Sequence, residues 1–211
     1  MKTMILVMYL APMGWLPDSN ETYVNTMMQT IGEVYNATDP KGLQETINKL
    51  DRIAAAEPDK WEPYYYKAYA SIMVGVMTEK SVEKDQWYEQ ALEAVRKGRE
   101  IAPAEAELVA LRGFALMMKV AVNPEVRGPE YSPLAMQAFG QALGMDEGNP
   151  RALYLMANMQ LGMAQFFGQG PEEACGTLQK AIESFSTYKS ENPLAPQWGQ
   201  AQAEAMQENC K

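Results

Sequence analysis

Histidine is absent from this chain of 211 residues, and cysteine occurs only twice. Histidine is the most common general base and metal ligand in proteins, so its absence removes most Ser-His and Cys-His nucleophile systems. Two cysteines without histidine also supply too few ligands for a zinc site. We therefore predict that the protein is not an enzyme, and that it has no catalytic residues, no metal site and no cofactor.

Positive charge is scarce as well, because 18 Lys and Arg residues face 27 Asp and Glu residues. The net charge of −9 argues against a nucleic-acid partner and against an anionic membrane. The pairs Glu105/Glu107 and Glu172/Glu173 resemble acid–base pairs, but each lies where a helix is predicted to start. Carboxylates at that position stabilise the helix dipole, which explains both pairs without catalysis.

Long apolar runs are missing except near the beginning of the chain. Lys2 is followed by residues 4–16, which are apolar apart from Pro12 and Gly14. This is the plan of a secretory signal peptide, and the run is too short to cross a bilayer of ~30 Å as a helix. We therefore predict that residues 1–19 are a signal peptide and that the protein is exported, either periplasmic or secreted. The alternative is an apolar N-terminal segment that packs on the rest of the chain.

The remaining chain has the composition of helices. Ala, Met, Leu, Glu and Gln dominate its long segments, and no run of alternating β-branched residues occurs, so we predict an all-α fold. Pro58, Pro103, Glu147 and Pro193 follow one another at intervals of 45, 44 and 46 residues, and each precedes a predicted helix. A constant interval of this size indicates an array of helix pairs. The helices after the four anchors are expected at residues 61–77, 108–119, 153–163 and 198–210.

The repeats share one packing pattern. A small residue stands ten positions after each anchor, where it allows a partner helix to approach closely. The helix before each of the last three anchors has apolar or small residues at spacings of four and three, which lie on one helical face. The first set is Ala68, Gly113, Ala157 and Ala203, and the second is Ala91/Val95/Gly98, Ala135/Phe139/Ala142 and Ala181/Phe185/Tyr188.

These residues resemble the tetratricopeptide repeat family. A further resemblance, to the exported members found in Bacteroidota, is carried by the segments Arg127-Gly128, Asn149-Pro150-Arg151-Ala152, Phe166-Phe167-Gly168 and Pro196-Gln197-Trp198-Gly199. The resemblance implies an α-solenoid of antiparallel helix pairs over residues 20–211, with one further pair at 20–56 that uses Asp39-Pro40 as a helix start. The family's usual period is about 34 residues. We expect the roughly ten extra residues per repeat in the loops inside each pair, at 78–85, 123–133 and 168–171.

The two cysteines lie on the last two predicted helices. These helices are expected to form an antiparallel pair that turns near residues 189–195. Cys175 and Cys210 are then each about 15 residues from the turn, so they lie side by side at the same distance along the two helices. We therefore predict a disulfide, which requires an oxidising compartment and agrees with export. The alternative is two free, half-buried thiols.

The resemblance implies that the first helix of each pair lines the concave surface. We predict a noncatalytic scaffold that binds a protein or peptide there; the alternatives are a self-assembling structural protein, with homo-oligomers formed by end-to-end stacking, and a soft-metal or small-molecule carrier. Met156, Met159 and Met163 share a helical face, but such stripes usually belong to a core or groove. The predicted binding residues, some of which could instead be core, are Tyr65, Tyr69, Met73, Phe114, Met117, Met118, Tyr154 and Asn158.

Overall fold

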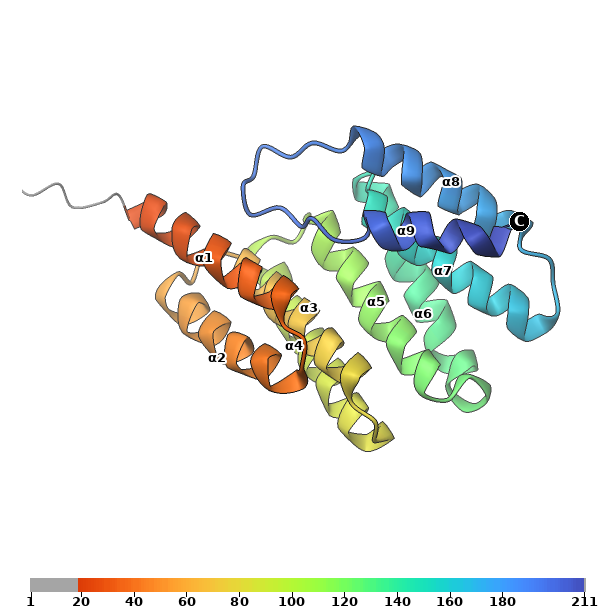
Figure 1. Cartoon of the computed structure of the whole chain (residues 1–211), viewed down its shortest axis with the longest axis horizontal. Helices are drawn as coiled ribbons and strands as arrows, with labels where there is room; N and C mark the ends of the chain where they lie inside the picture. The colour runs from red at the N-terminus through yellow and green to blue at the C-terminus, as the bar shows by residue number, and fades with distance from the viewer. Residues whose placement is uncertain (1–18, 211) are drawn as a thin grey trace, which may run out of the picture.

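A computed structural model describes residues 19–210, and within this range it contains nine α-helices, one short 3₁₀ helix and no β-strand. The first eight helices stack as four antiparallel pairs, and α9 lies against the last pair (Figure 1). The predicted all-α solenoid is therefore confirmed. The helices are α1 (Ser19–Asn36), α2 (Pro40–Ala56), α3 (Glu62–Met77), α4 (Ser81–Ile101), α5 (Ala106–Val122), α6 (Pro124–Met145), α7 (Pro150–Phe167), α8 (Glu172–Thr187), α9 (Gln200–Met206) and the 3₁₀ helix Gln207–Cys210.

The small residues of the repeat pattern lie at the helix crossings. Ala68, Ala157 and Ala203 have no exposed surface, and Gly113 is also buried. A Cβ atom added to Gly113 would stand 2.3 Å from Cε1 of Phe139 on α6. Glycine is therefore required where α5 and α6 approach each other, because any side chain would have to displace an aromatic ring in a packed core.

We expect Gly113→Ala to lower the free energy of unfolding by about 1–3 kcal/mol, since the added methyl overpacks this crossing. Gly162 on α7 is the matched control, because a Cβ there meets no atom within 4 Å. Gly162→Ala should stabilise the protein by about 0.5–1 kcal/mol through the helix propensity of alanine. Thermal or urea denaturation of both variants measures the contrast; two changes of the same sign would contradict this account of the crossing.

The extra residues of each repeat lie mostly in helices, so the prediction of long loops inside the pairs is wrong at residues 123–133. The second helices are long, with 21 residues in α4 and 22 in α6. Asn123 caps α6 by accepting a hydrogen bond from the amide of Val126, and Pro124 occupies the first turn. Arg127 then joins the first turn of α6 to Asp85 of α4, at 2.6 Å in one of its two hydrogen bonds. Pro129 and Pro133 were expected to interrupt a helix, but both lie inside α6.

The first helix pair, α1 and α2, agrees with the sequence. Asp39 caps α2 by accepting a hydrogen bond from the amide of Gly42 at 2.9 Å, and Pro40 begins the helix. The predicted signal peptide at residues 1–19 lies outside the described residues except for Ser19, where α1 starts. No helix in the described part of the chain is both long and apolar enough to cross a membrane.

An irregular segment, residues 188–199, connects α8 to α9 and is here called the strap. It runs from the end of α8 back toward α1 and α3 before the chain turns into α9 (Figure 1). Its Leu194 and Trp198 belong to the same buried cluster as α1 to α5, and the hydroxyl of Tyr66 donates to the carbonyl of Leu194 at 2.7 Å. The last helix consequently begins at Gln200 and not at residue 198, after Gly199 with a φ of 109°.

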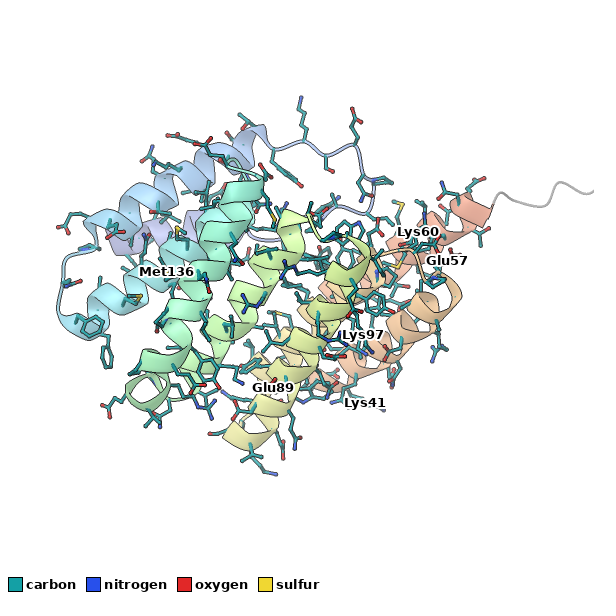
Figure 2. All side chains as sticks on the ribbon, turned by 180° about the vertical axis from the view of Figure 1, so that it is seen from behind. Lys41, Glu57, Lys60, Glu89, Lys97 and Met136 are labelled. Carbon is teal, nitrogen blue, oxygen red and sulfur yellow. A yellow bond between two sulfur atoms is a disulfide. The ribbon has the colours of Figure 1, made fainter. Side chains whose placement is uncertain are left out.

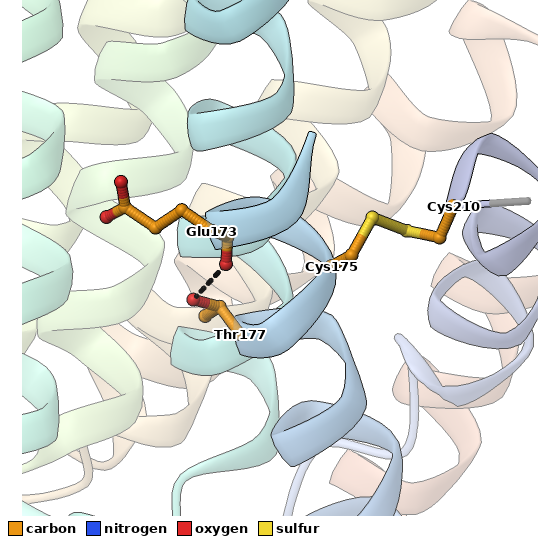
Figure 3. The surroundings of a disulfide bond; sticks show 4 residues. All are labelled: Glu173, Cys175, Thr177 and Cys210. Atoms are coloured by element: carbon orange, nitrogen blue, oxygen red, sulfur yellow. Dashed lines mark hydrogen bonds between the residues drawn. A yellow bond between two sulfur atoms is a disulfide. The ribbon is translucent and has the colours of Figure 1, made fainter. Parts of the chain in front are cut away.

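The predicted disulfide between Cys175 and Cys210 is confirmed. Cys175 lies in the first turn of α8 and Cys210 ends the 3₁₀ helix, with their Cα atoms 5.8 Å apart (Figure 3). The bond joins the end of the described chain to the helix beside it. It therefore fixes α9, which follows the strap, against the body of the solenoid.

Candidate functional site

A groove of about 480 Å³ lies between the N-terminal helices and the end of the strap, and is here called the aromatic groove. One wall comes from α1, α2 and α3, and the other from residues 197–202. None of the described residues that line it is charged. The lining is Val34, Tyr35, Ala37, Leu43, Tyr69, Met73, Met77, Gln197, Trp198, Gly199, Gln200, Ala201 and Gln202. Charged residues lie elsewhere, for example Glu89 and Lys97 on the outer surface of α4 (Figure 2).

Trp198 is the central ring of this site. Its ring centroid lies 5.1 Å from that of Tyr69 on α3 and 5.8 Å from that of Phe114 on α5. Tyr35 of α1 packs edge-on against Tyr69, with centroids 6.0 Å apart. Only 8% of Trp198 is exposed, so the indole holds the strap on the helices and also contributes to the groove wall.

A chain of buried hydrogen bonds lies behind Trp198. Its Nε1 donates to the hydroxyl of Tyr65 at 2.9 Å, and this hydroxyl lies 3.3 Å from Oε2 of Glu107. Glu107 also accepts from Nδ2 of Asn149 and from Nε of Arg151, each at 2.8 Å. Burial, followed by the charge of Glu107, raises the pKa of Tyr65, so the phenol stays neutral.

Arg151 is the most unusual member of this chain, because its side chain is only 1% exposed. Burial alone would lower its pKa, but the hydrogen bonds and charge of Glu107 outweigh it and raise the pKa. The guanidinium carbon also lies 4.6 Å from the ring centroid of Tyr188, where α8 ends and the strap begins. Arg151 thus joins α7 to α5 by an ion pair and to the strap by a cation–π contact.

The sequence-predicted binding residues fall into three groups. Tyr69 and Met73 line the aromatic groove, and Phe114 packs behind it on Trp198. Tyr65 and Met117 are buried and are not available for direct contact with a ligand. Met118, Tyr154 and Asn158 are half-buried and do not line the groove. The strap covers the middle of the predicted strip, since Trp198 contacts three of its residues: Tyr65, Tyr69 and Phe114.

Tyr35, Met77 and Trp198 line the groove but were not among the residues predicted from the sequence. Tyr35 lies on the first helix of the N-terminal pair, which the repeat alignment did not include. Trp198 was assigned to a helix, although Pro193, Pro196 and Gly199 around it are a signal for irregular backbone. Among the described residues, no group of three or more Cys, Asp or Glu side chains is placed to hold a metal ion.

Comparison with known proteins finds matches among solved structures. No family model and no curated protein matches the chain. It is similar to the structure of the HusA haemophore from Porphyromonas gingivalis, with a TM-score of 0.77, 26% identity, and coverage of 94% of this chain and 96% of that one. It also shares the fold of TTC0263, a thermophilic tetratricopeptide protein from Thermus thermophilus, with a TM-score of 0.56, 17% identity, and coverage of 89% of this chain and 98% of that one.

The chain is a tetratricopeptide-like solenoid. The resemblance inferred from the repeats is confirmed, since the architecture matches a protein of that repeat class over most of its length. The likeness to a haemophore extends over nearly the whole of both chains. Together these findings support the coarse class of a helical-repeat scaffold.

Proposed function

We propose that this protein is a noncatalytic carrier that binds a flat, apolar macrocycle of the haem type in the aromatic groove. The observation that carries the proposal is an uncharged groove of about 480 Å³ with Tyr35, Tyr69 and Trp198 in its walls. This volume falls in the range of about 300–1,000 Å³ that small-molecule sites occupy. The similarity to a haemophore over almost the full length of both chains supports the same ligand class.

The residues of the groove favour contact with the face of the macrocycle over coordination of its metal. The chain has no histidine. Burial raises the pKa values of Tyr35 and Tyr69, so a phenolate ligand is unfavourable at neutral pH. The thioethers of Met73 and Met77 are the remaining soft donors in the lining. We therefore expect metal-free protoporphyrin IX to bind within about threefold of haemin, because ring stacking and apolar contact need no iron.

Met77 offers the sharpest test of where the ligand binds. It is 42% exposed in the groove, whereas Met145, at the end of α6, is 46% exposed and does not line it. We expect Met77→Ala to weaken haemin binding by about three- to tenfold through lost apolar contact, and Met145→Ala to leave it unchanged. Absorbance of the haemin Soret band and quenching of tryptophan fluorescence measure both variants. No saturable binding by the wild type, or equal effects of both changes, would refute this site.

We also propose that the protein is exported. The Cys175–Cys210 disulfide is typical of an oxidising compartment, and the apolar run at residues 4–16 after Lys2 has the plan of a signal peptide. Cell fractionation of the native host, with N-terminal sequencing of the mature chain, tests both points. Recovery of the uncleaved chain with reduced thiols from the cytoplasm would contradict the proposal.

A protein or peptide partner is the second candidate. The strap is a nonhelical segment of the chain that already lies on α3 and α5, where its Trp198 covers Tyr65, Tyr69 and Phe114. A partner would therefore occupy the open groove or displace the strap. Capture of one partner from host extracts by the wild type, and not by Met77→Ala, would favour this function if haemin does not bind.

End-to-end assembly is the third candidate, and light scattering tests it. A monomer whose mass does not change with concentration would contradict it.

A further inference from the structure

The hydrogen bonds behind the groove have a fixed direction, which follows from the chemistry of their members. The indole N–H of Trp198 can only donate, and the carboxylate of Glu107 can only accept. Tyr65 lies between them, 2.9 Å from the indole nitrogen and 3.3 Å from Oε2 of Glu107. Its hydroxyl proton is therefore directed at Glu107, and its oxygen lone pair accepts the indole proton.

Glu107 is itself held in place by two other residues. Nε of Arg151 donates to both of its carboxylate oxygens at 2.8 Å, and Nδ2 of Asn149 donates to Oε1 at 2.8 Å. All of these groups are buried and come from three separate helix pairs and the strap. The acceptor presented to Trp198 is consequently fixed by the body of the solenoid and not by the strap.

We propose that Tyr65 is a positioning residue for the aromatic groove: it does not contact the ligand but sets the orientation of Trp198. The strap has no regular secondary structure, and Trp198 is part of the groove wall that the strap contributes. Contacts with the rings of Tyr69 and Phe114 hold the plane of the indole, but a half-turn about its Cβ–Cγ bond would keep that plane and reverse the direction of the N–H. The hydrogen bond to Tyr65 removes this freedom, so that the wall is already formed before a ligand binds.

Tyr65→Phe tests the proposal because it removes one hydroxyl and keeps the buried ring. Tyr88, another fully buried tyrosine, packs on Gly75 and does not line the groove, so Tyr88→Phe is the control. The first readout needs no ligand. In ¹H–¹⁵N spectra the indole peak of Trp198, assigned by its loss in Trp198→Phe, should shift and exchange faster with solvent in Tyr65→Phe only.

The second readout is haemin affinity, and it rests on the proposed function. We expect Tyr65→Phe to weaken binding by about three- to tenfold, and Tyr88→Phe to change it by less than about twofold. In a Trp198→Phe background, which lacks the indole N–H, Tyr65→Phe should have no further effect on affinity. This non-additivity distinguishes positioning from a general loss of stability, which would lower affinity equally in both backgrounds.

The outcomes separate the two proposals. An unchanged Trp198 indole peak in Tyr65→Phe overturns the positioning role, whether or not haemin binds. Additive losses of affinity in the double-mutant cycle overturn it as well. A shifted indole peak in Tyr65→Phe, together with no haemin binding by the wild type, supports the role of Tyr65 on Trp198 and removes only the proposed ligand.

Discussion

Replacing Arg151 with methionine is expected to lower the free energy of unfolding by about 3–5 kcal/mol, because it leaves the carboxylate of Glu107 buried without its cation. Glu107 and Arg151 are both almost fully buried, and Nη2 of Arg151 lies 2.7 Å from Oε1 of Glu107. Methionine preserves much of the apolar volume, so the loss reports charge and not a cavity. Urea denaturation followed by circular dichroism measures it.

Arg96 on α4 is the matched control for this change. It also pairs with glutamates, Glu93 and Glu100, but its side chain is 56% exposed. Water screens such pairs, so Arg96→Met should cost far less stability than Arg151→Met. Combining Arg151→Met with Glu107→Leu should recover a large part of the loss, because the pair is then replaced by apolar groups. Equal losses of unfolding free energy in Arg151→Met and Arg96→Met would show that the buried pair does not stabilise the protein more than an exposed pair does.

The packing of the solenoid could be predicted from the sequence because it depends on local pattern. The small residues ten positions after each anchor, such as Ala68 and Gly113, are buried as expected. The cysteines were placed correctly by counting residues along two helices. In both cases the helical rise and period convert spacing in the sequence directly into position in space.

The buried polar chain was not predicted, although the repeat contains a signal for it. The fourth position after each anchor is polar in every repeat, occupied by Glu62, Glu107, Arg151 and Gln197. Glu107 was assigned to the dipole of its helix, which is the usual role of a carboxylate in a first turn. Its burial depends on Arg151 from the next repeat, and such a pairing appears only when the repeats are stacked.

The strap could not be predicted for a different physical reason. It has no hydrophobic period, and its prolines indicate only where helices end. Its position depends on individual tertiary contacts, such as the hydrogen bond from Tyr66 to the carbonyl of Leu194 and the stacking of Trp198. The predicted binding strip therefore remains a prediction, and the chain itself already covers part of it through Trp198.

Removing the disulfide by Cys175→Ser with Cys210→Ser is expected to lower the free energy of unfolding by about 3–4 kcal/mol. The bond closes a loop with a sequence separation of 35 residues. It also secures α9, which has only seven residues and buries only Ala203 and Met206. A helix this short is not stable alone in water, so hydrogen exchange in residues 200–210 should rise strongly while α3 stays protected.

The same change tests how the two sides of the aromatic groove are held. Gly199 and the first three residues of α9 line the groove, whereas Trp198 is fixed separately by Tyr65 and the aromatic rings that it contacts. Loss of the disulfide should therefore weaken haemin binding by loosening one edge, without releasing Trp198 from its indole hydrogen bond. Reduced wild-type protein should show the same haemin affinity and hydrogen exchange as the double variant. Reductant should change neither property in the variant. If exchange rises equally in α3 and α9, the disulfide stabilises the whole solenoid and not this edge, because the groove wall would then unfold only with the core.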